Sequence, residues 1–194
     1  MALHFSPISR DSDVSNFSCG HADLDEFLID DSMEYQQERL SVTRLAYINS
    51  EIVGFFTLVT DCIDAKQVAS EDGRRGYPYA QTSGYISGIL EVASEDGRRG
   101  YPYRMYPAIK IARLATSKTH QRNGIGSLML REVLALTIMI SEYVGCRIIT
   151  VDAKPGSVGF YEKFGFKRAM SKRSDLVPMY MDYHRLLEEE PRIG

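Results

Sequence analysis

The sequence predicts a mixed α/β fold with a parallel pair of strands at its centre. Two β-rich runs, at 42–48 and 52–63, are separated by the turn residues 49–51, a pattern typical of a hairpin. After residue 108 a strand, a helix, a second strand and a second helix alternate, which is the order of a parallel βαβ unit. The 194 residues suffice for one sizeable core, so we expect a single domain over 1–194.

The first forty residues predict a short strand followed by helix. Residues 3–8 favour a strand that ends near a proline, and residues 18–21 are typical of a loop. Residues 23–40 combine many acids with spaced apolar residues, which indicates one or two amphipathic helices. In the hairpin that follows, Gly54 indicates a β-bulge or the close approach of another backbone segment.

An unchanged repeat interrupts the chain after the hairpin. The sequence VASEDGRRGYPY occupies residues 68–79 and again residues 92–103. Repeats of stacked-repeat folds diverge and bury an apolar pattern, so such a fold is not predicted. We interpret residues 64–105 as a long inter-strand insertion that contains a recent duplication. It is either a substrate-facing loop or a tolerated insertion without function.

Four strands and two helices are predicted after the insertion. The strands are expected at 108–116, 147–152, 166–168 and 177–183, and the helices at 127–144 and 155–164. Gly145 is a suitable stop for the longer helix, and the shorter one begins at Pro155 and is closed by Gly165. The strand at 147–152 has the apolar middle of a buried parallel strand.

Composition excludes several classes of protein. A net charge of −3 with a pI of about 5.8 argues against a dedicated nucleic-acid binder, although a local basic patch is compatible with it. The three cysteines lack the spacing of a metal site, so no metal is expected, and their odd number suits reduced thiols. No apolar run reaches the roughly 18 residues that cross a bilayer, and no secretion signal is recognisable. We therefore expect a cytoplasmic protein.

The most informative motif is a glycine-rich turn between a strand and a helix. It reads Gln121-Arg122-Asn123-Gly124-Ile125-Gly126. Backbone N–H groups and the positive end of the helix dipole converge at such a turn, which makes it suitable for a diphosphate. A dinucleotide site would require a third glycine and an acid about 20 residues further on, and a kinase-type phosphate loop would end in Gly-Lys-Ser/Thr. Both are absent from this sequence.

Three features in order resemble the GNAT superfamily of acetyl-CoA-dependent N-acetyltransferases. The strand 111–116 leads into the loop 121–126, which is similar to the Gln/Arg-x-x-Gly-x-Gly/Ala loop of that family, and 160–166 is similar to its Tyr-Glu-Lys-x-Gly-Phe box. The resemblance extends over residues 42–183. It implies the GNAT acyltransferase fold, a mixed central sheet with a splayed parallel strand pair and flanking helices, and acetyl-CoA as cosubstrate.

The resemblance also implies which residues contact coenzyme A. Gly124 and Gly126 would let the backbone approach the diphosphate without a Cβ in the way. Lys154 stands where family members often have an asparagine, and a lysine there is able to reach a phosphate. The diphosphate would bind Gln121, Arg122, Asn123, Ile125 and Ser127 through backbone N–H groups, and the pantetheine arm would follow Leu114, Ala115 and Thr116.

Tyr161 is the catalytic residue that the resemblance implies, as the acid that protonates the leaving thiolate. A phenol has a pKa near 10 and is therefore protonated at neutral pH, as such an acid must be. The alternative is that Tyr161 is simply a core aromatic. The acceptor amine would attack the thioester directly, with the oxyanion bound by a backbone N–H near Leu114 or Ala115. No general base is identified: Asp152 is one candidate, a structural role for it is the alternative, and His120 is interpreted as a polar loop residue.

Two features concern the acceptor. Residues 17–28 contain Cys-Gly-x-x-x-Leu-x-x-Phe-Leu and resemble the first helix of a GNAT subgroup that includes toxins acetylating the amino group of charged tRNA; Arg113-Leu114-Ala115 is similar to the same subgroup. A basic cluster follows Tyr161, which suits a nucleic acid but is also typical of a solvated face. Its members are Lys163, Lys167, Arg168, Lys172 and Arg173.

The leading prediction is an N-acetyltransferase that moves acetyl from acetyl-CoA to a primary amine of an unknown acceptor, which is a small molecule, a peptide or aminoacyl-tRNA. Two alternatives stay open. One is a toxin that acetylates the amino group of aminoacyl-tRNA and has an antitoxin partner. The other is a non-catalytic sensor or scaffold that binds coenzyme A. No membrane partner is expected, and a homodimer is an open option.

Overall fold

The computed structural model describes residues 3–64, 67, 105–169 and 175–183. The duplicated segment therefore lies outside the described residues. The chain forms two compact units, the first made of residues 1–60 and 109–145 and the second of residues 61–108 and 146–194. The two strands that frame the insertion, β3 (Glu51–Asp64) and β4 (Met105–Thr116), each continue from one unit into the other.

The first unit contains an antiparallel meander. Strand β1 (Leu3–Pro7) pairs with β2 (Val42–Ile48), and β2 pairs with β3. The predicted hairpin is confirmed, with Asn49 in the left-handed region at φ 58°. The predicted bulge is also confirmed, because the β2–β3 register shifts between Ala46 and Tyr47, next to the Ala46–Gly54 pair.

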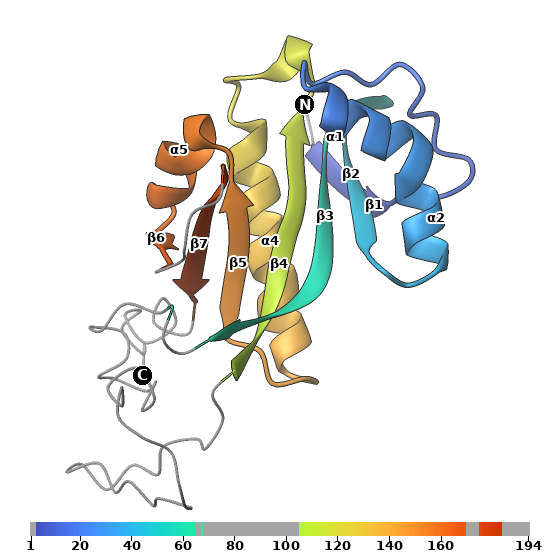
Figure 1. The fold of residues 1–194 in the computed structure, drawn as a ribbon. Helices are drawn as coiled ribbons and strands as arrows, with labels where there is room; N and C mark the ends of the chain where they lie inside the picture. Colours follow the sequence, from blue (N-terminus) through green and yellow to red (C-terminus); the bar gives the residue numbers. More distant parts are fainter. Residues whose placement is uncertain (1–2, 65–66, 68–104, 170–174, 184–194) are drawn as a thin grey trace, which may run out of the picture. The chain divides into compact units, whose positions relative to one another are not determined.

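Three short helical segments cover one face of these strands (Figure 1). They are α1 (Ala22–Glu26), the π-helical turn η1 (Phe27–Asp31) and α2 (Ser32–Gln37), which follow one another without a break. The predicted helix over 23–40 is thus confirmed, although it ends at Gln37. The segment buries Phe27 and Leu28 against Leu45 of β2 and Phe55 of β3, and this cluster also includes Ala115 of β4.

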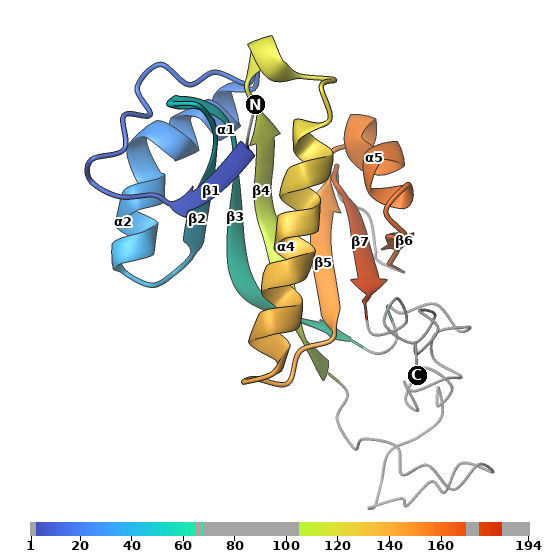
Figure 2. The same ribbon diagram turned by 180° about the vertical axis from the view of Figure 1, so that it is seen from behind.

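Helix α4 (Ile125–Ser141) lies on the opposite face (Figure 2). The prediction that Gly145 stops this helix was wrong: the helix ends at Ser141, and Gly145 does not take a positive φ. Tyr143 and Val144 are 84% and 63% exposed, so no apolar burial holds a further helical turn in place. Among the described residues no helix has the length and hydropathy needed to cross a membrane.

The second unit contains strands β5 (Ile148–Ala153), β7 (Val177–Asp182) and β6 (Lys167–Arg168), with β7 antiparallel to both others. Helix α5 (Val158–Glu162) follows the 3₁₀ turn η5 (Pro155–Ser157), so the predicted helix at 155–164 is divided into two segments. Arg147 binds Asp182 through two hydrogen bonds of 3.2 and 2.5 Å at the end of the β5–β7 ladder. A core of Ile63, Tyr106, Ala108, Ile148 and Tyr180 belongs to this unit.

Candidate active site

The glycine-rich loop connects β4 to α4 in the first unit. After β4, the Ser117 N–H donates to the Val53 carbonyl at 2.9 Å, and the 3₁₀ turn η4 (Lys118–His120) leads into the loop. Arg122 and Gly124 both take positive φ, 63° and 81°, and Gly124 is the N-cap of α4. A Cβ at Gly124 would meet no atom within 4 Å. The glycine therefore serves the left-handed backbone conformation and leaves open space above the loop.

The loop has the properties of an anion site. The first intrahelical bond of α4 runs from the Leu128 N–H to the Gly124 carbonyl at 3.1 Å. The N–H groups of Ile125, Gly126 and Ser127 therefore have no acceptor within the helix. The first turn of this 17-residue helix carries no acidic side chain. Free N–H groups and an uncompensated helix dipole together favour a bound phosphate.

Gln121 has a structural role that the sequence did not indicate. Its side-chain amide donates to the carbonyl of Cys19 at 2.8 Å and, at 3.4 Å, to that of Thr116. Nearby, the Lys118 N–H donates to the Ser18 carbonyl at 2.8 Å. These bonds join the start of the loop to residues 17–28, the segment that resembles the toxin subgroup.

The turn that receives Gln121 is held by a carboxylate. Asp25 accepts hydrogen bonds from the Cys19 N–H at 2.8 Å and from the Ser18 hydroxyl at 3.0 Å, and Gly20 turns the chain at φ 86°. Burial alone raises the pKa of Asp25, but the hydrogen bonds from Cys19, Ser18 and Gly20 outweigh it and hold the pKa below its usual range. Burial, with the Asp25 carboxylate close by, raises the pKa of the Cys19 thiol to about 11. Cys19 is therefore not an activated nucleophile.

The strand residues before the loop are close to the core. Ala115 is 5% exposed, whereas Leu114 and Thr116 are half-buried. A Cβ built at Gly54 would lie 2.8 Å from the Ala115 carbonyl oxygen and 2.9 Å from the Sδ and Cε atoms of Met129 in α4. The predicted close approach at Gly54 is thus confirmed, and it leaves room for the backbone of β4 at Ala115.

His120 takes part in a polar network beside the loop. Its Nδ1 lies 2.9 Å from the Ser117 hydroxyl and 3.0 Å from the Thr119 hydroxyl, and 3.7 Å from a carboxylate oxygen of Glu51. These contacts agree with its interpretation as a polar loop residue.

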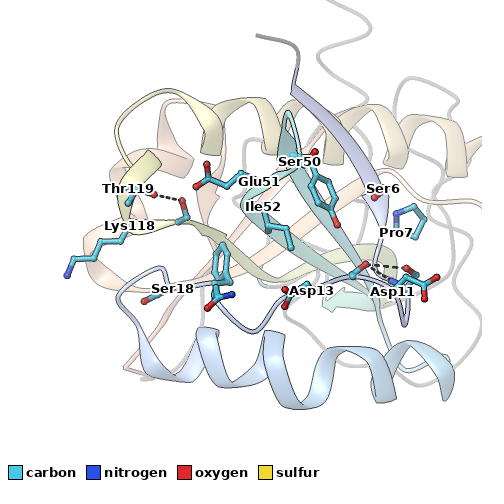
Figure 3. A pocket seen from close by; sticks show the side chains of 16 residues that line it. Ser6, Pro7, Asp11, Asp13, Ser18, Ser50, Glu51, Ile52, Lys118 and Thr119 are labelled. Carbon is cyan, nitrogen blue, oxygen red and sulfur yellow. Dashed lines mark hydrogen bonds between the residues drawn. The ribbon is translucent and has the colours of Figure 1, made fainter.

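A hollow of about 830 Å³ in the first unit is lined in part by the partners of His120, namely Glu51, Ser117 and Thr119 (Figure 3). Asp11 and Asp13 from the segment before α1, Glu51 of the hairpin and Lys118 contribute its charged groups, and the Lys118 side chain points away from the carboxylates. None of the predicted cofactor-binding residues lines it.

Tyr161 belongs to α5 in the second unit. Its ring packs edge-on against Phe160 and Phe166, with ring centres 5.1 and 5.3 Å apart. The Phe166 N–H donates to the Tyr161 carbonyl at 3.2 Å and the Gly165 N–H to the Glu162 carbonyl at 3.0 Å, with Gly165 at φ 86°. These two bonds form a Schellman motif, which explains why glycine and phenylalanine follow the tyrosine at fixed distances.

The Tyr161 side chain is buried, and its hydroxyl makes no hydrogen bond to the described part of the chain. The residue is 6% exposed, and burial raises the pKa of its phenol. The phenol is therefore protonated at neutral pH, as the acid role requires, while its ring also fulfils the packing role of the alternative.

The remaining predicted residues of the second unit belong to β5 and the turn after it, to the end of α5 and to β6. Lys154 is half-buried and directly precedes η5, and the exposed Asp152 is paired in register with Pro178. Of the basic cluster, Lys163, Lys167 and Arg168 are exposed, and Arg168 forms a 3.2 Å ion pair with Glu162. Lys172 and Arg173 lie outside the described residues.

This chain is similar to known acetyltransferases over most of its length. The family described as "Acetyltransferase (GNAT) domain" matches residues 57–182, more than half of the chain. A curated relative, the tRNA-acetylating toxin of Mycobacterium tuberculosis, is 24% identical over 181 residues, which cover 93% of each protein.

Solved structures of toxins share the fold. AtaT complexed with acetyl-methionyl-tRNAfMet is 16% identical with a TM-score of 0.76, over 96% of this chain and 98% of that one. A second structure is a tyrosine-to-phenylalanine mutant of the AtaT toxin bound to the C-terminus of the antitoxin AtaR and to acetyl-CoA. It is 16% identical with a TM-score of 0.67, over 96% of this chain and 98% of that one. The GNAT fold and its mixed α/β class are thus as predicted. Because the domain match extends over most of the elements described above, the chain belongs to the GNAT family of acetyl-CoA-dependent acetyltransferases.

Proposed function

We propose that this protein transfers the acetyl group of acetyl-CoA to the α-amino group of an aminoacyl-tRNA and acts as a toxin. The observation that carries the proposal is the similarity to a tRNA-acetylating toxin over 93% of both proteins. The hydrogen bond from Gln121 to Cys19 supports it, because it connects the cofactor loop to the segment that resembles that subgroup. An antitoxin partner and a cytoplasmic location are part of the proposal.

The proposed cofactor site uses backbone groups for the diphosphate and a strand for the pantetheine arm. The free N–H groups at the start of α4 bind phosphate oxygens, and the left-handed Gly124 lets the loop approach them. Lys154 adds a positive charge. The proposed contacts are Leu114, Ala115, Thr116, Gln121, Arg122, Asn123, Gly124, Ile125, Gly126, Ser127 and Lys154.

The proposed reaction is a direct transfer without a covalent enzyme intermediate. The neutral amine attacks the thioester carbonyl carbon, a C–N bond forms, and the carbonyl oxygen becomes an oxyanion that a backbone N–H of β4 stabilises. The C–S bond then breaks, and the thiolate takes the proton of the Tyr161 hydroxyl. Tyr161 recovers its proton from solvent, and the nitrogen releases its extra proton to water.

The proposal is tested by incubating the purified protein with radiolabelled acetyl-CoA and total aminoacylated tRNA. We expect acid-precipitable label that is lost when the aminoacyl ester is hydrolysed, and mass spectrometry of the released N-acetyl amino acid identifies the acceptor. Deacylated tRNA is the control, since it lacks the amine. Label transfer to a panel of small amines or peptides instead of to tRNA would favour the general amine acceptor. If the protein binds acetyl-CoA but releases no free coenzyme A thiol with any of these acceptors, the non-catalytic sensor would be favoured.

A further inference from the structure

Arg113 occupies an unusual position for an arginine. It is a half-buried residue of β4 directly before Leu114, and its guanidinium carbon lies 3.4 Å from the centre of the Phe27 ring of η1. This contact is a cation–π stack, which fixes the plane of the guanidinium against the helical segment. Burial lowers the pKa of Arg113, and the neighbouring Tyr35 and the carboxylates of Asp31 and Asp23 act in the opposite direction.

The hydrogen-bonding capacity of this guanidinium is unused. Arg44, Arg147 and Arg168 each have a carboxylate within 4 Å. Arg113 has neither an ion pair at that distance nor a hydrogen bond to any residue that the structure describes. A guanidinium carries five N–H donors, and leaving them without acceptors in a partly desolvated site is unfavourable, although Asp31 and Asp23 act on the charge from beyond ion-pair distance. An anionic ligand would supply the missing acceptors.

The position on the strand indicates which ligand this is. Arg113 lies one and two residues from Leu114 and Ala115, about 3 to 7 Å along the strand from the proposed oxyanion contact. An amino acid esterified to tRNA has no free α-carboxylate. The anion nearest to the reacting amine that every aminoacyl-tRNA carries is therefore the phosphodiester on the 5′ side of the terminal nucleoside. The planar fork of arginine matches two phosphate oxygens.

We propose that Arg113 binds this last phosphodiester of the aminoacyl-tRNA acceptor and thereby sets the specificity for acceptors that carry a phosphate. This inference rests on the proposed function. Asp23 and Asp31 raise the negative potential around the guanidinium. Free phosphate is therefore bound weakly, and the contact forms when the rest of the acceptor delivers the phosphodiester.

The experiment compares two acceptors, both charged with the amino acid that the test on total tRNA identifies. One is 3′-O-aminoacyl-adenosine, which has no phosphate. The other carries the same aminoacyl group on the dinucleotide CpA, which has one phosphodiester. Wild type, Arg113→Gln and Arg113→Lys are assayed on both. Arg131→Gln is the matched control, since Arg131 is exposed on α4 of the same unit. Wild type and Arg131→Gln should prefer the dinucleotide in kcat/KM by roughly tenfold to a hundredfold, the scale of a hydrogen bond to a charged group.

Arg113→Gln should remove this preference by raising the KM for the dinucleotide. The kcat/KM for the adenosine acceptor and the KM for acetyl-CoA should stay the same. Arg113→Lys should restore part of the preference, because it keeps the charge but not the fork. Equal losses on both acceptors would show that Arg113 only packs on Phe27, and wild type without preference would also overturn the inference while the proposed function stands. Failure of wild type to acetylate total aminoacyl-tRNA would overturn the proposed function, and this inference with it.

Discussion

Gly54 is the position where a single methyl group should disturb both stability and cofactor binding. The residue is buried in β3, and the Cβ of an alanine there would lie 2.8 Å from the Ala115 carbonyl oxygen and 2.9 Å from the end of Met129. Real Cβ atoms essentially never approach other heavy atoms this closely. The thioether of Met129 is flexible and is able to rotate away, but the carbonyl belongs to the backbone of β4 and moves only with the strand.

The expected magnitude follows from the cost of overpacking a core. Such insertions destabilise by about 1–3 kcal/mol, and a protein of this size loses about 2–4 °C of melting temperature per kcal/mol. Gly54→Ala should therefore melt about 2 to 12 °C below wild type. Because the strand that must yield carries Ala115, the affinity for coenzyme A should fall as well.

Thermal unfolding and isothermal titration with coenzyme A measure the two effects. Gly145→Ala is the matched control: it makes the same change in the same unit where a Cβ would meet nothing within 4 Å, and it should stay within about 0.5 kcal/mol of wild type. A Gly54→Ala protein with the melting temperature and coenzyme A affinity of wild type would refute the reasoning.

The other predictions concern the loop, the acid and the turn before α1. Gly124→Asp should abolish coenzyme A binding, and Gly124→Asn, which also tolerates a positive φ, should weaken it less because it adds no negative charge; equal calorimetric affinities for both variants would contradict a phosphate at this loop. Tyr161→Phe should retain coenzyme A binding and lose roughly 10²-fold or more in kcat, the usual scale for a general acid, and a turnover like that of wild type would move the acid elsewhere. At pH 8 iodoacetamide should alkylate the exposed Cys62 and spare the buried Cys19, which has only about one thiolate in a thousand at a pKa of about 11; mass mapping with both thiols labelled would disprove the packing of this turn. Asp25→Asn should lower the free energy of unfolding at pH 7 and make it depend less on pH in the acid range. A carboxyl group whose pKa is depressed in the folded protein adds stability at pH values above its pKa in the unfolded chain, and this stability is lost as the pH falls through its pKa in the folded protein. Parallel curves of stability against pH for both proteins would argue against this role.

Local patterns predicted most of the elements and one long-range contact. Hairpin residues 49–51, the strands around the insertion and the closing turn at Gly165 depend on short-range rules of turn geometry and side-chain alternation, and all are present. Gly54 was predicted to mark a β-bulge or the close approach of another backbone segment, because a glycine inside an apolar strand has few other uses, and both are present. The error at Gly145 has a local cause as well: the apolar run to Val144 favours helix, but Tyr143 and Val144 find no surface to pack on.

The sequence alone determined the family and the cofactor, because the glycine-rich turn and its neighbouring strand are contiguous in the chain. The tertiary structure revealed what side chains do over long separations. Gln121 reaches Cys19 across the first unit, Asp25 holds the turn that receives it, and Arg113 stacks on Phe27 with its donors unused. Such contacts depend on which strand faces which helix, and neither residue spacing nor periodicity carries that information.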